Sequence, residues 1–215
     1  MKLYTFFRNS AGHRVRIALH LKEISFDYVS VDIRKGAQHE ESFRKINPLS
    51  LIPALEDKGK VITQSSAIIE YLEDLYPEPS IFPQDPIARA RSRAFAATIA
   101  SEIHSLNNVR VHRFMAKSLD LSTEQRNEWY QHWCSVGLTA LERDVTTYDS
   151  GAKFGFADYP TMGDIFLVPQ MLNLRRANFD LTPYPRLVEI AEACKRHPAF
   201  IKAAPEAQPD YVEGQ

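Results

Sequence analysis

The sequence predicts an α/β domain with a mixed sheet over residues 1–78, joined to an all-helical domain over residues 87–215. Strand and helix patterns alternate along the first part of the chain, whereas no strand pattern follows Pro86. Between the two parts, prolines at positions 77, 79, 83 and 86 give the composition of a connector. A chain of 215 residues is also long for one compact domain and sufficient for two.

The first domain is expected to follow the order β-α-β-α-β-β-α. Short runs rich in β-branched and aromatic residues indicate its strands, and apolar residues three and four positions apart indicate its helices. Asn9 or Ser10 is the expected N-cap of the first helix, and Ser65 or Ser66 that of the last one. The expected elements are strands at 3–7, 26–33, 51–55 and 61–62, with helices starting near residue 10, spanning 38–46 and ending near 76.

The second domain is expected to contain only helices. A helical pattern runs from residue 87 to about residue 119, with a bend near Asn107. Capping boxes at Ser122 and Thr161, in which the N-cap residue and the residue three positions later satisfy each other's backbone N–H groups, open the next two helices. These helices extend to about 145 and 177, and Pro169 is expected to kink the second. A last helix covers 184–196.

Composition narrows the classes of function. The net charge is −1 and the pI is about 6.7, so nothing steers the chain to nucleic acid or to an anionic membrane. No apolar run approaches the roughly 18 residues of a membrane span, and no signal region precedes the first strand, which indicates a cytoplasmic protein. Cys134 and Cys194 fit no metal or redox spacing and the histidines form no ligand set, so no metal is expected.

Two features of the first domain suit a peptide ligand. A cis bond at Ile52-Pro53 would leave the Ile52 backbone free to pair with an extended peptide, although an edge-strand proline explains the same residues. Gln64-Ser65-Ser66 lies where a strand meets a helix, and unpaired amides at a helix N-terminus attract a carboxylate. A plain serine N-cap is the alternative interpretation there.

Arg8-Asn9-Ser10 lies between the first strand and the first helix, at the end of the sheet where α/β folds usually bind ligands. A hydroxyl or amide at this place can hydrogen-bond a thiolate. Lowering a thiol pKa of about 8.5 by about two units takes roughly 2.7 kcal/mol, which one or two hydrogen bonds and a helix terminus supply. Helix capping is the alternative role for Asn9 and Ser10.

Polar residues also gather at two places in the second domain. His104 and Asn108 share one face of a straight helix and Asn107 and Arg110 another. His104 and Arg110 therefore reach one cleft only if the helix bends or the cleft wraps around it. A solvated polar face is the alternative interpretation of this group. Arg176 ends the proline-containing helix, where a cation is favourable even without a ligand.

Several short segments, spread over nearly the whole chain, carry a resemblance to a known family. In the first domain they are Lys2-Leu3-Tyr4, Arg14-Val15-Arg16-Ile17-Ala18-Leu19, Asn47-Pro48, Ile52-Pro53-Ala54-Leu55 and the segment from Gln64 to Leu72. In the second they are Ile103-His104, Asn107-Asn108, Thr161-Met162-Gly163-Asp164 and the segment from Leu181 to Pro185. With these segments the chain resembles the zeta class of glutathione transferases, the group that contains maleylacetoacetate and maleylpyruvate isomerases.

The resemblance implies a thioredoxin-like first domain, a homodimer, glutathione as the cofactor and a small dianionic substrate. It implies that Pro53 is cis and that the Ile52 backbone pairs with the cysteinyl unit of glutathione. The other residues implied for cofactor binding are Gln64 and Ser65 at the γ-glutamyl end, Gln38 or His39 at the glycine end, and His104 and Asn108. Those implied for substrate binding are Arg8, Arg110 and Arg176, and those implied for catalysis are Arg8, Asn9 and Ser10.

One departure from the family pattern concerns the thiol site. Zeta enzymes usually carry Ser-Ser-Cys after the arginine, whereas this chain has Asn9-Ser10-Ala11. An asparagine NH₂ group can still donate a hydrogen bond to a thiolate. The expected function is a glutathione-dependent cis–trans isomerase of maleylacetoacetate or maleylpyruvate in aromatic compound catabolism, acting by reversible thiolate addition. A transferase that conjugates electrophiles and a glutathione-binding module without turnover are the alternatives.

Overall fold

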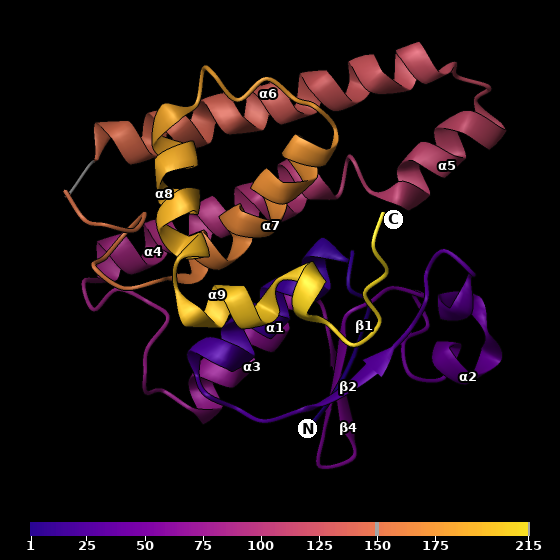
Figure 1. Ribbon diagram of the computed structural model, residues 1–215, viewed down its shortest axis with the longest axis horizontal. Helices are drawn as coiled ribbons and strands as arrows, with labels where there is room; N and C mark the ends of the chain where they lie inside the picture. Colours follow the sequence, from indigo (N-terminus) through magenta and orange to yellow (C-terminus); the bar gives the residue numbers. More distant parts are fainter. Residues whose placement is uncertain (149–150, 215) are drawn as a thin grey trace. The chain divides into compact units, whose positions relative to one another are not determined.

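The structure, a computed structural model, describes residues 1–148 and 151–214 (Figure 1). Internal contacts divide the chain into two compact units. The first comprises Met1–Ile81 together with Lys195–Gln215, and the second comprises Phe82–Cys194. The second unit is therefore shorter at its C-terminal end than the range 87–215 that the sequence predicts for the helical domain.

A four-stranded sheet forms the centre of the first unit. Its strands are β1 (Lys2–Thr5), β2 (Asp27–Ser30), β3 (Ala54–Asp57) and β4 (Lys60–Thr63), and their order across the sheet is β2-β1-β3-β4. β1 pairs with β2 in parallel and with β3 in antiparallel, and β3 and β4 form an antiparallel hairpin. The mixed sheet predicted from the sequence is confirmed.

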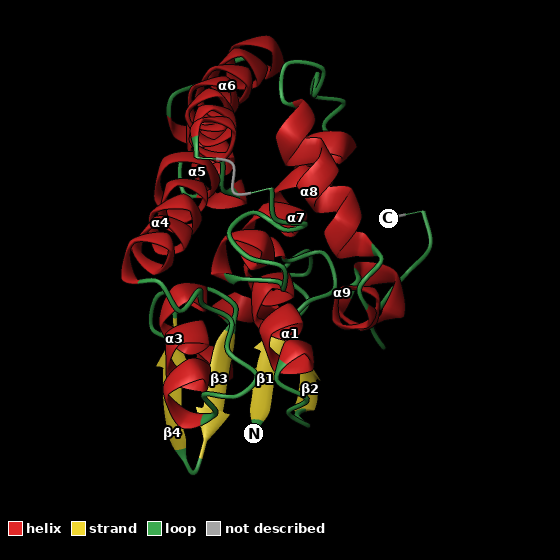
Figure 2. Ribbon diagram, turned by 90° about the vertical axis from the view of Figure 1, so that its left-hand side faces the viewer, coloured by secondary structure: helices red, strands yellow, loops and turns green. Residues whose placement is uncertain are grey.

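Two long helices accompany this sheet. Figure 2 shows α1 and α3 lying over the same face of the strands. Apolar residues at helical spacing bury this face, with Val15, Leu19, Ile68 and Leu72 fully inaccessible to solvent. The helical segments of the unit are α1 (Ser10–Leu21), η1 (Ala37–His39), α2 (Glu41–Arg44), α3 (Ser65–Leu75), α9 (Pro198–Ala203) and η3 (Pro205–Ala207).

The C-terminal segment groups with the first unit, although the sequence places it in the helical domain. α9 packs along α1, and Arg16 of α1 donates through Nε to the Ala203 carbonyl oxygen, 3.1 Å away. The Asp210 carboxylate accepts from Tyr28 Oη at 2.7 Å and from Ser30 Oγ at 2.6 Å. These contacts join residues 180 or more positions apart, so periodicity along the chain does not reveal them.

The third strand is shorter than predicted. It begins at Ala54, after Pro53, instead of spanning 51–55, because a proline cannot donate a hydrogen bond to a neighbouring strand. The hairpin that follows turns at Lys58 and Gly59, which have φ values of 48° and 72°. Positive φ at both central residues is the geometry of a tight two-residue hairpin turn.

The second unit contains helices in its described part. The single helix predicted for 87–119 is divided by a π-helical turn and a break at residues 105–108. Both predicted capping boxes are present, at Ser122 with Gln125 and at Thr161 with Asp164. The elements are α4 (Pro86–Ala97), the π-helix η2 (Thr98–His104), α5 (Val109–Ser118), α6 (Thr123–Thr147), α7 (Met162–Arg176) and α8 (Pro185–Lys195).

α7 forms the core of this unit. It is buried along most of its length, and Ile165, Phe166 and Leu167 have no exposed surface. Close packing also occurs between α6 and η2, where a Cβ on Gly137 would lie 2.4 Å from the Ile103 side chain. The absence of a side chain at Gly137 therefore leaves room for the Ile103 side chain against α6.

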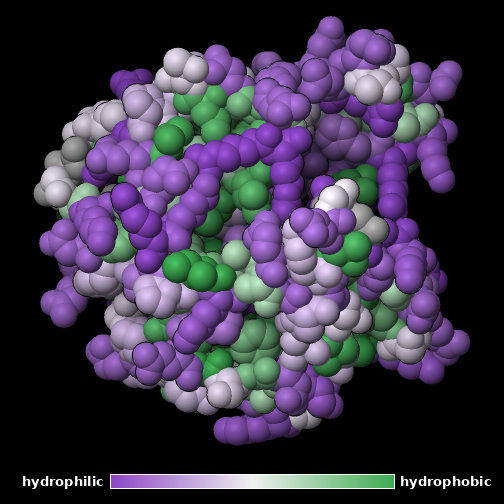
Figure 3. Space-filling view, in the orientation of Figure 1, coloured by the Kyte–Doolittle hydropathy of each residue, from purple (hydrophilic) through white to green (hydrophobic). Residues whose placement is uncertain are grey.

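Hydrophilic side chains cover most of the face shown in Figure 3, with smaller apolar areas between them. Such a mixture is usual for a protein surface. Within the described residues, no helix has the length and apolar character needed to cross a lipid bilayer.

Candidate functional site

The turn after β1 carries the predicted thiol site. Asn9 is the N-cap of α1: its backbone is extended, and its side-chain oxygen accepts from the Gly12 N–H. The Asn9 backbone N–H donates in turn to the Phe6 carbonyl oxygen at 2.9 Å. Within the described chain, the Asn9 side-chain NH₂ group has no hydrogen-bond partner. Asparagine therefore caps the helix with its oxygen while its NH₂ stays available as a donor.

The two neighbours of Asn9 differ in exposure. Arg8 is exposed at the end of the turn, and Ser10 is buried in the first turn of α1. A buried hydroxyl suits packing against the turn, whereas an exposed guanidinium can reach a ligand in solution.

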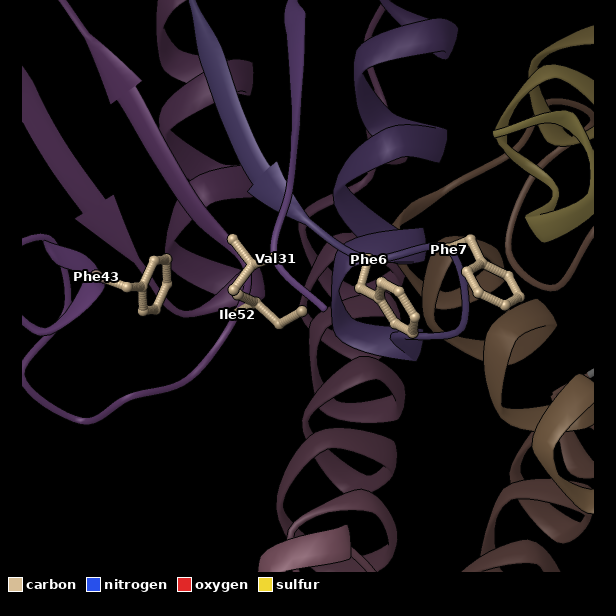
Figure 4. Close-up of a cluster of buried hydrophobic side chains, with 5 residues drawn as sticks. All are labelled: Phe6, Phe7, Val31, Phe43 and Ile52. Carbon is tan, nitrogen blue, oxygen red and sulfur yellow. The ribbon is translucent and has the colours of Figure 1, made fainter. Parts of the chain in front are cut away.

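A cluster of buried apolar side chains supports the ends of the strands. It consists of Phe6, Phe7, Val31, Phe43 and Ile52. Figure 4 shows these side chains in a row past the ends of the strands, with Phe6 and Phe7 on the turn that leads into α1. The Phe6 and Phe7 rings lie 4.7 Å apart. This packing connects the turn after β1 to the segment that precedes β3.

The predicted cis bond between Ile52 and Pro53 is confirmed. Among the described residues, the N–H and C=O groups of Ile52 have no hydrogen-bond partner, although its side chain is buried. Backbone groups of this kind need water or a ligand as a partner. An extended peptide that ran past Ile52 could use both groups, as an added strand does.

The start of α3 differs from the prediction. Gln64, and neither Ser65 nor Ser66, is the N-cap, and it provides no side-chain cap. Its φ of 70° and ψ of 120° lie in a region that non-glycine residues rarely adopt. Because the side chain caps nothing, the first N–H groups of α3 find no acceptor among the described residues. Unpaired N–H groups and the helix dipole make this end an anion site.

A buried cation lies behind this helix end. Arg14 Nη1 donates to Ser65 Oγ at 3.4 Å, and burial lowers the pKa of Arg14 to about 9. A group with this pKa keeps its charge at neutral pH. Its positive charge therefore adds to the attraction that the α3 terminus exerts on a carboxylate.

Gln38 lies in η1 and is buried, whereas its neighbour His39 is exposed. The Gln38 Nε2 and His39 Nε2 atoms lie 3.1 Å apart. The Gln38 Oε1 atom has no hydrogen-bond partner in the described part of the chain. A buried acceptor without a donor is costly, so this oxygen suits a donor group of a ligand.

In the second unit, His104 and Asn108 do not share a helix face as predicted, because the helix is interrupted between them. His104 is the last residue of η2, and Asn108 is the N-cap of α5. The Asn108 side-chain oxygen accepts from the Arg110 N–H at 3.1 Å. Asn107 donates through Nδ2 to Cys134 Sγ at 3.5 Å. These asparagines shape the break between two helices.

The predicted substrate-binding arginines fall in both units. Arg8 belongs to the first unit, and Arg110 and Arg176 belong to the second, where both are exposed. Arg175, next to Arg176, forms an ion pair with Glu192 at 2.6 Å. Their common use of one substrate stays a prediction.

Local sequence patterns assign no role to Arg14 and Arg16, although both are almost fully buried in α1. The signal was their position on an apolar helical stretch, where a charged residue needs a specific set of partners. The described residues contain no group of three histidine, cysteine or acidic residues suited to hold a metal ion.

Comparison with known proteins agrees with this geometry. Residues 1–74 match the family model of the glutathione S-transferase N-terminal domain, which is thioredoxin-like. The chain is 40% identical to a maleylpyruvate isomerase of Ralstonia sp over 98% of this chain and 99% of that relative.

Solved structures show the same similarity. A holo structure of a maleyl pyruvate isomerase, a bacterial zeta-class glutathione S-transferase, has a TM-score of 0.95 at 40% identity, covering 99% of this chain and 100% of that one. A maleylacetoacetate isomerase from Methylobacterium extorquens AM1, with bound malonate and GSH, has a TM-score of 0.94 at 32% identity with the same coverage. The chain therefore belongs to the zeta class of the glutathione S-transferase family.

Proposed function

We propose that the protein is a glutathione-dependent cis–trans isomerase of a maleyl-keto acid, with maleylpyruvate or maleylacetoacetate as substrate. The reaction follows from the relatives, since the chain is 40% identical to the maleylpyruvate isomerase of Ralstonia sp along nearly its whole length. The choice of glutathione as cofactor rests on one observation: among the described residues, the backbone N–H and C=O groups of Ile52, beside the cis Pro53, have no hydrogen-bond partner.

The residues present fit glutathione along its length. Ile52 would hold the cysteinyl unit through its backbone, and the N–H groups at the start of α3, with Gln64 and Ser65, would hold the γ-glutamyl carboxylate. Gln38 would accept a donor near the glycine end. His104 and Asn108 are proposed to complete the cofactor site.

When bound, glutathione supplies a thiolate nucleophile that adds reversibly to the cis double bond and so permits rotation. The side-chain NH₂ of Asn9 is proposed to donate to the sulfur, and the N-terminus of α1 adds a favourable dipole. Together they favour the ionised form of the thiol. Ser10 is proposed as an assisting residue within the same turn.

Three arginines are proposed to bind the dianionic substrate. Arg8, Arg110 and Arg176 are exposed, and a guanidinium can hold a carboxylate through two parallel hydrogen bonds. Positive charge near the substrate also stabilises negative charge that develops during addition. We further propose that the protein acts in the cytoplasm as a homodimer, as the family resemblance implies.

Glutathione-dependent isomerisation tests this proposal directly. The loss of maleylpyruvate and of maleylacetoacetate is followed by absorbance, each with and without glutathione. Turnover that requires glutathione is the expected result, and the faster substrate identifies the reaction. Conjugation of apolar electrophiles without isomerisation would instead support a general transferase, and glutathione binding without either reaction would support a binding module.

A further inference from the structure

Arg16, one of the two buried arginines of α1, donates several hydrogen bonds to the turn between β1 and α1. Its side chain has no exposed surface. Nη1 donates to Thr5 Oγ1 and to the Phe6 carbonyl oxygen, each at 3.3 Å, and Nη2 donates to the Phe7 carbonyl oxygen at 3.1 Å. One planar guanidinium therefore binds three consecutive residues at the end of β1.

The Phe6 carbonyl oxygen links Arg16 to Asn9. This oxygen accepts from Arg16 Nη1 and also from the Asn9 backbone N–H, at 2.9 Å. The position of the Asn9 backbone thus depends on a carbonyl group that Arg16 holds from the other side. A carbonyl oxygen has two lone pairs and can accept both bonds.

The opposite side of the guanidinium contacts the C-terminal segment. Nε donates to the Ala203 carbonyl oxygen of α9 at 3.1 Å. In addition, the Tyr211 ring packs edge-on against the Phe7 ring, with centroids 5.6 Å apart. The C-terminal segment therefore holds both Arg16 and the turn that Arg16 organises.

In the described part of the chain, no acidic side chain forms an ion pair with Arg16. The hydrogen-bond acceptors it uses among the described residues are all uncharged. The charged or titratable groups that act on it from neighbouring elements are Tyr28 of β2, Glu206 of η3 and Asp210, and on α1 itself it faces His20. Burial lowers the pKa of Arg16 to about 10, so it stays protonated at neutral pH.

We propose that Arg16 is a positioning residue for the thiol site: it fixes the Phe6–Asn9 turn so that the Asn9 NH₂ group and the start of α1 stabilise the glutathione thiolate. This inference rests on the proposed function. Arg16 is not proposed to touch cofactor or substrate; it acts through the carbonyl groups of Phe6 and Phe7 that it holds. A lysine at position 16 keeps the charge but cannot reproduce the planar fork.

The Arg16→Lys variant with bound glutathione tests the inference. Ultraviolet absorbance of the thiolate, titrated against pH, gives the thiol pKa of bound glutathione, and calorimetry gives its affinity. We expect the thiol pKa to rise by about one unit, which corresponds to roughly a tenfold smaller thiolate fraction below that pKa. We expect glutathione affinity to change less than about threefold, because the Ile52 and α3 contacts remain.

Lys22→Arg is the matched control. Like Arg16→Lys, it replaces a buried basic residue near α1 by the other kind of basic residue, lysine by arginine. Lys22 donates to Glu73 at 2.6 Å and to the Tyr76 carbonyl oxygen, away from the Phe6–Asn9 turn. It is expected to alter the melting temperature without moving the thiol pKa. Arg16→Met, if it folds, should raise the thiol pKa further than Arg16→Lys.

The outcomes separate this inference from the proposed function. A wild-type protein that lowers the thiol pKa, together with an Arg16→Lys variant of unchanged thiol pKa and turnover, would overturn the positioning role alone. An equal rise of the thiol pKa in Lys22→Arg would also overturn it, because the effect would then be general destabilisation. A wild-type protein that does not bind glutathione would overturn both proposals.

Discussion

The backbone N–H groups at the N-termini of α3 and α7 differ in their hydrogen bonding. At α7, the Asp164 carboxylate accepts from the Thr161 N–H at 2.7 Å, from Thr161 Oγ1 at 2.8 Å and from the Gly155 N–H at 2.9 Å. The Gly163 N–H is also used, by Ser92 Oγ at 3.0 Å. At α3, Gln64 offers no cap, and the first amides find no acceptor among the described residues.

Burial explains why the two ends differ. Thr161 and Asp164 are buried, and an unpaired amide at such a place would cost about 1–3 kcal/mol. At the start of α3 Ser65 is buried but Ser66 is exposed, so the Ser66 amide can use water until an anion replaces it. A helix N-terminus with satisfied amides thus stabilises the fold, whereas one with unsatisfied amides is free to bind.

Removal of the α7 cap should have the largest effect on stability. Asp164→Ala deletes the acceptor of three hydrogen bonds in a buried site, and we expect a loss of about 3 kcal/mol in unfolding free energy. Urea denaturation measures this change. Asp85→Ala is the control, because Asp85 caps α4 at an exposed position and should cost only about 1 kcal/mol. Equal losses in the two variants would show that burial does not decide the value of a cap.

Asn9→Asp separates capping from catalysis at α1. The aspartate keeps an oxygen for the Gly12 N–H but has no NH₂ group, and its negative charge opposes a thiolate. We expect unchanged stability and roughly a 100-fold loss of kcat/KM, equivalent to about 2.7 kcal/mol. Steady-state kinetics and thermal melting measure the two effects, and Asn9→Ser, which restores a hydroxyl donor, should retain activity. Full activity of Asn9→Asp would rule out a donor role for the amide.

Two substitutions at Gln64 separate its backbone strain from its proposed contribution to glutathione binding. Gln64→Ala should weaken glutathione binding by about tenfold through loss of the side chain, while the strained backbone stays. Gln64→Gly should bind as weakly but be more stable than Gln64→Ala by about 1 kcal/mol, because glycine adopts positive φ without a steric penalty. Calorimetric titration and denaturation give both quantities. A glycine variant that is less stable than the alanine variant would contradict the strain argument.

His20, near the other end of α1, should give the smallest effect. Burial, with the nearby charges of Lys202 and Arg16, lowers the pKa of His20 below its usual value near 6.5. As pH falls below about 6.5, the unfolded chain takes up a proton on this histidine more readily than the folded chain does. The free energy of unfolding therefore decreases as pH falls from about 6.5 toward the folded-state pKa. We expect less than about 1 kcal/mol, since the side chain is only half-buried. A His20→Gln variant should reduce this dependence, measured by denaturation at several pH values; an unchanged dependence would assign it to other groups.

Much of the fold could be predicted from local sequence patterns. Strand and helix order in the first unit, the capping boxes at Ser122 and Thr161 and the hairpin at Lys58 and Gly59 all depend on neighbours within a few positions. The cis bond at Pro53 followed from the family resemblance. The predicted N-cap of α3 was wrong because the serine preference at N-caps is only statistical, and here the backbone of Gln64 takes that position.

The sequence by itself determined the family and the order of the elements, and it predicted which residues form the proposed cofactor site. Only the tertiary structure decided which polar groups have no hydrogen-bond partner in the described part of the chain. These are the Ile52 backbone groups, the Gln38 side-chain oxygen and the Asn9 NH₂ group. It also decided that Arg16 joins the thiol-site turn to α9. The physical reason is that hydrogen-bond satisfaction depends on distances between residues far apart in the chain, whereas sequence patterns record only local preference.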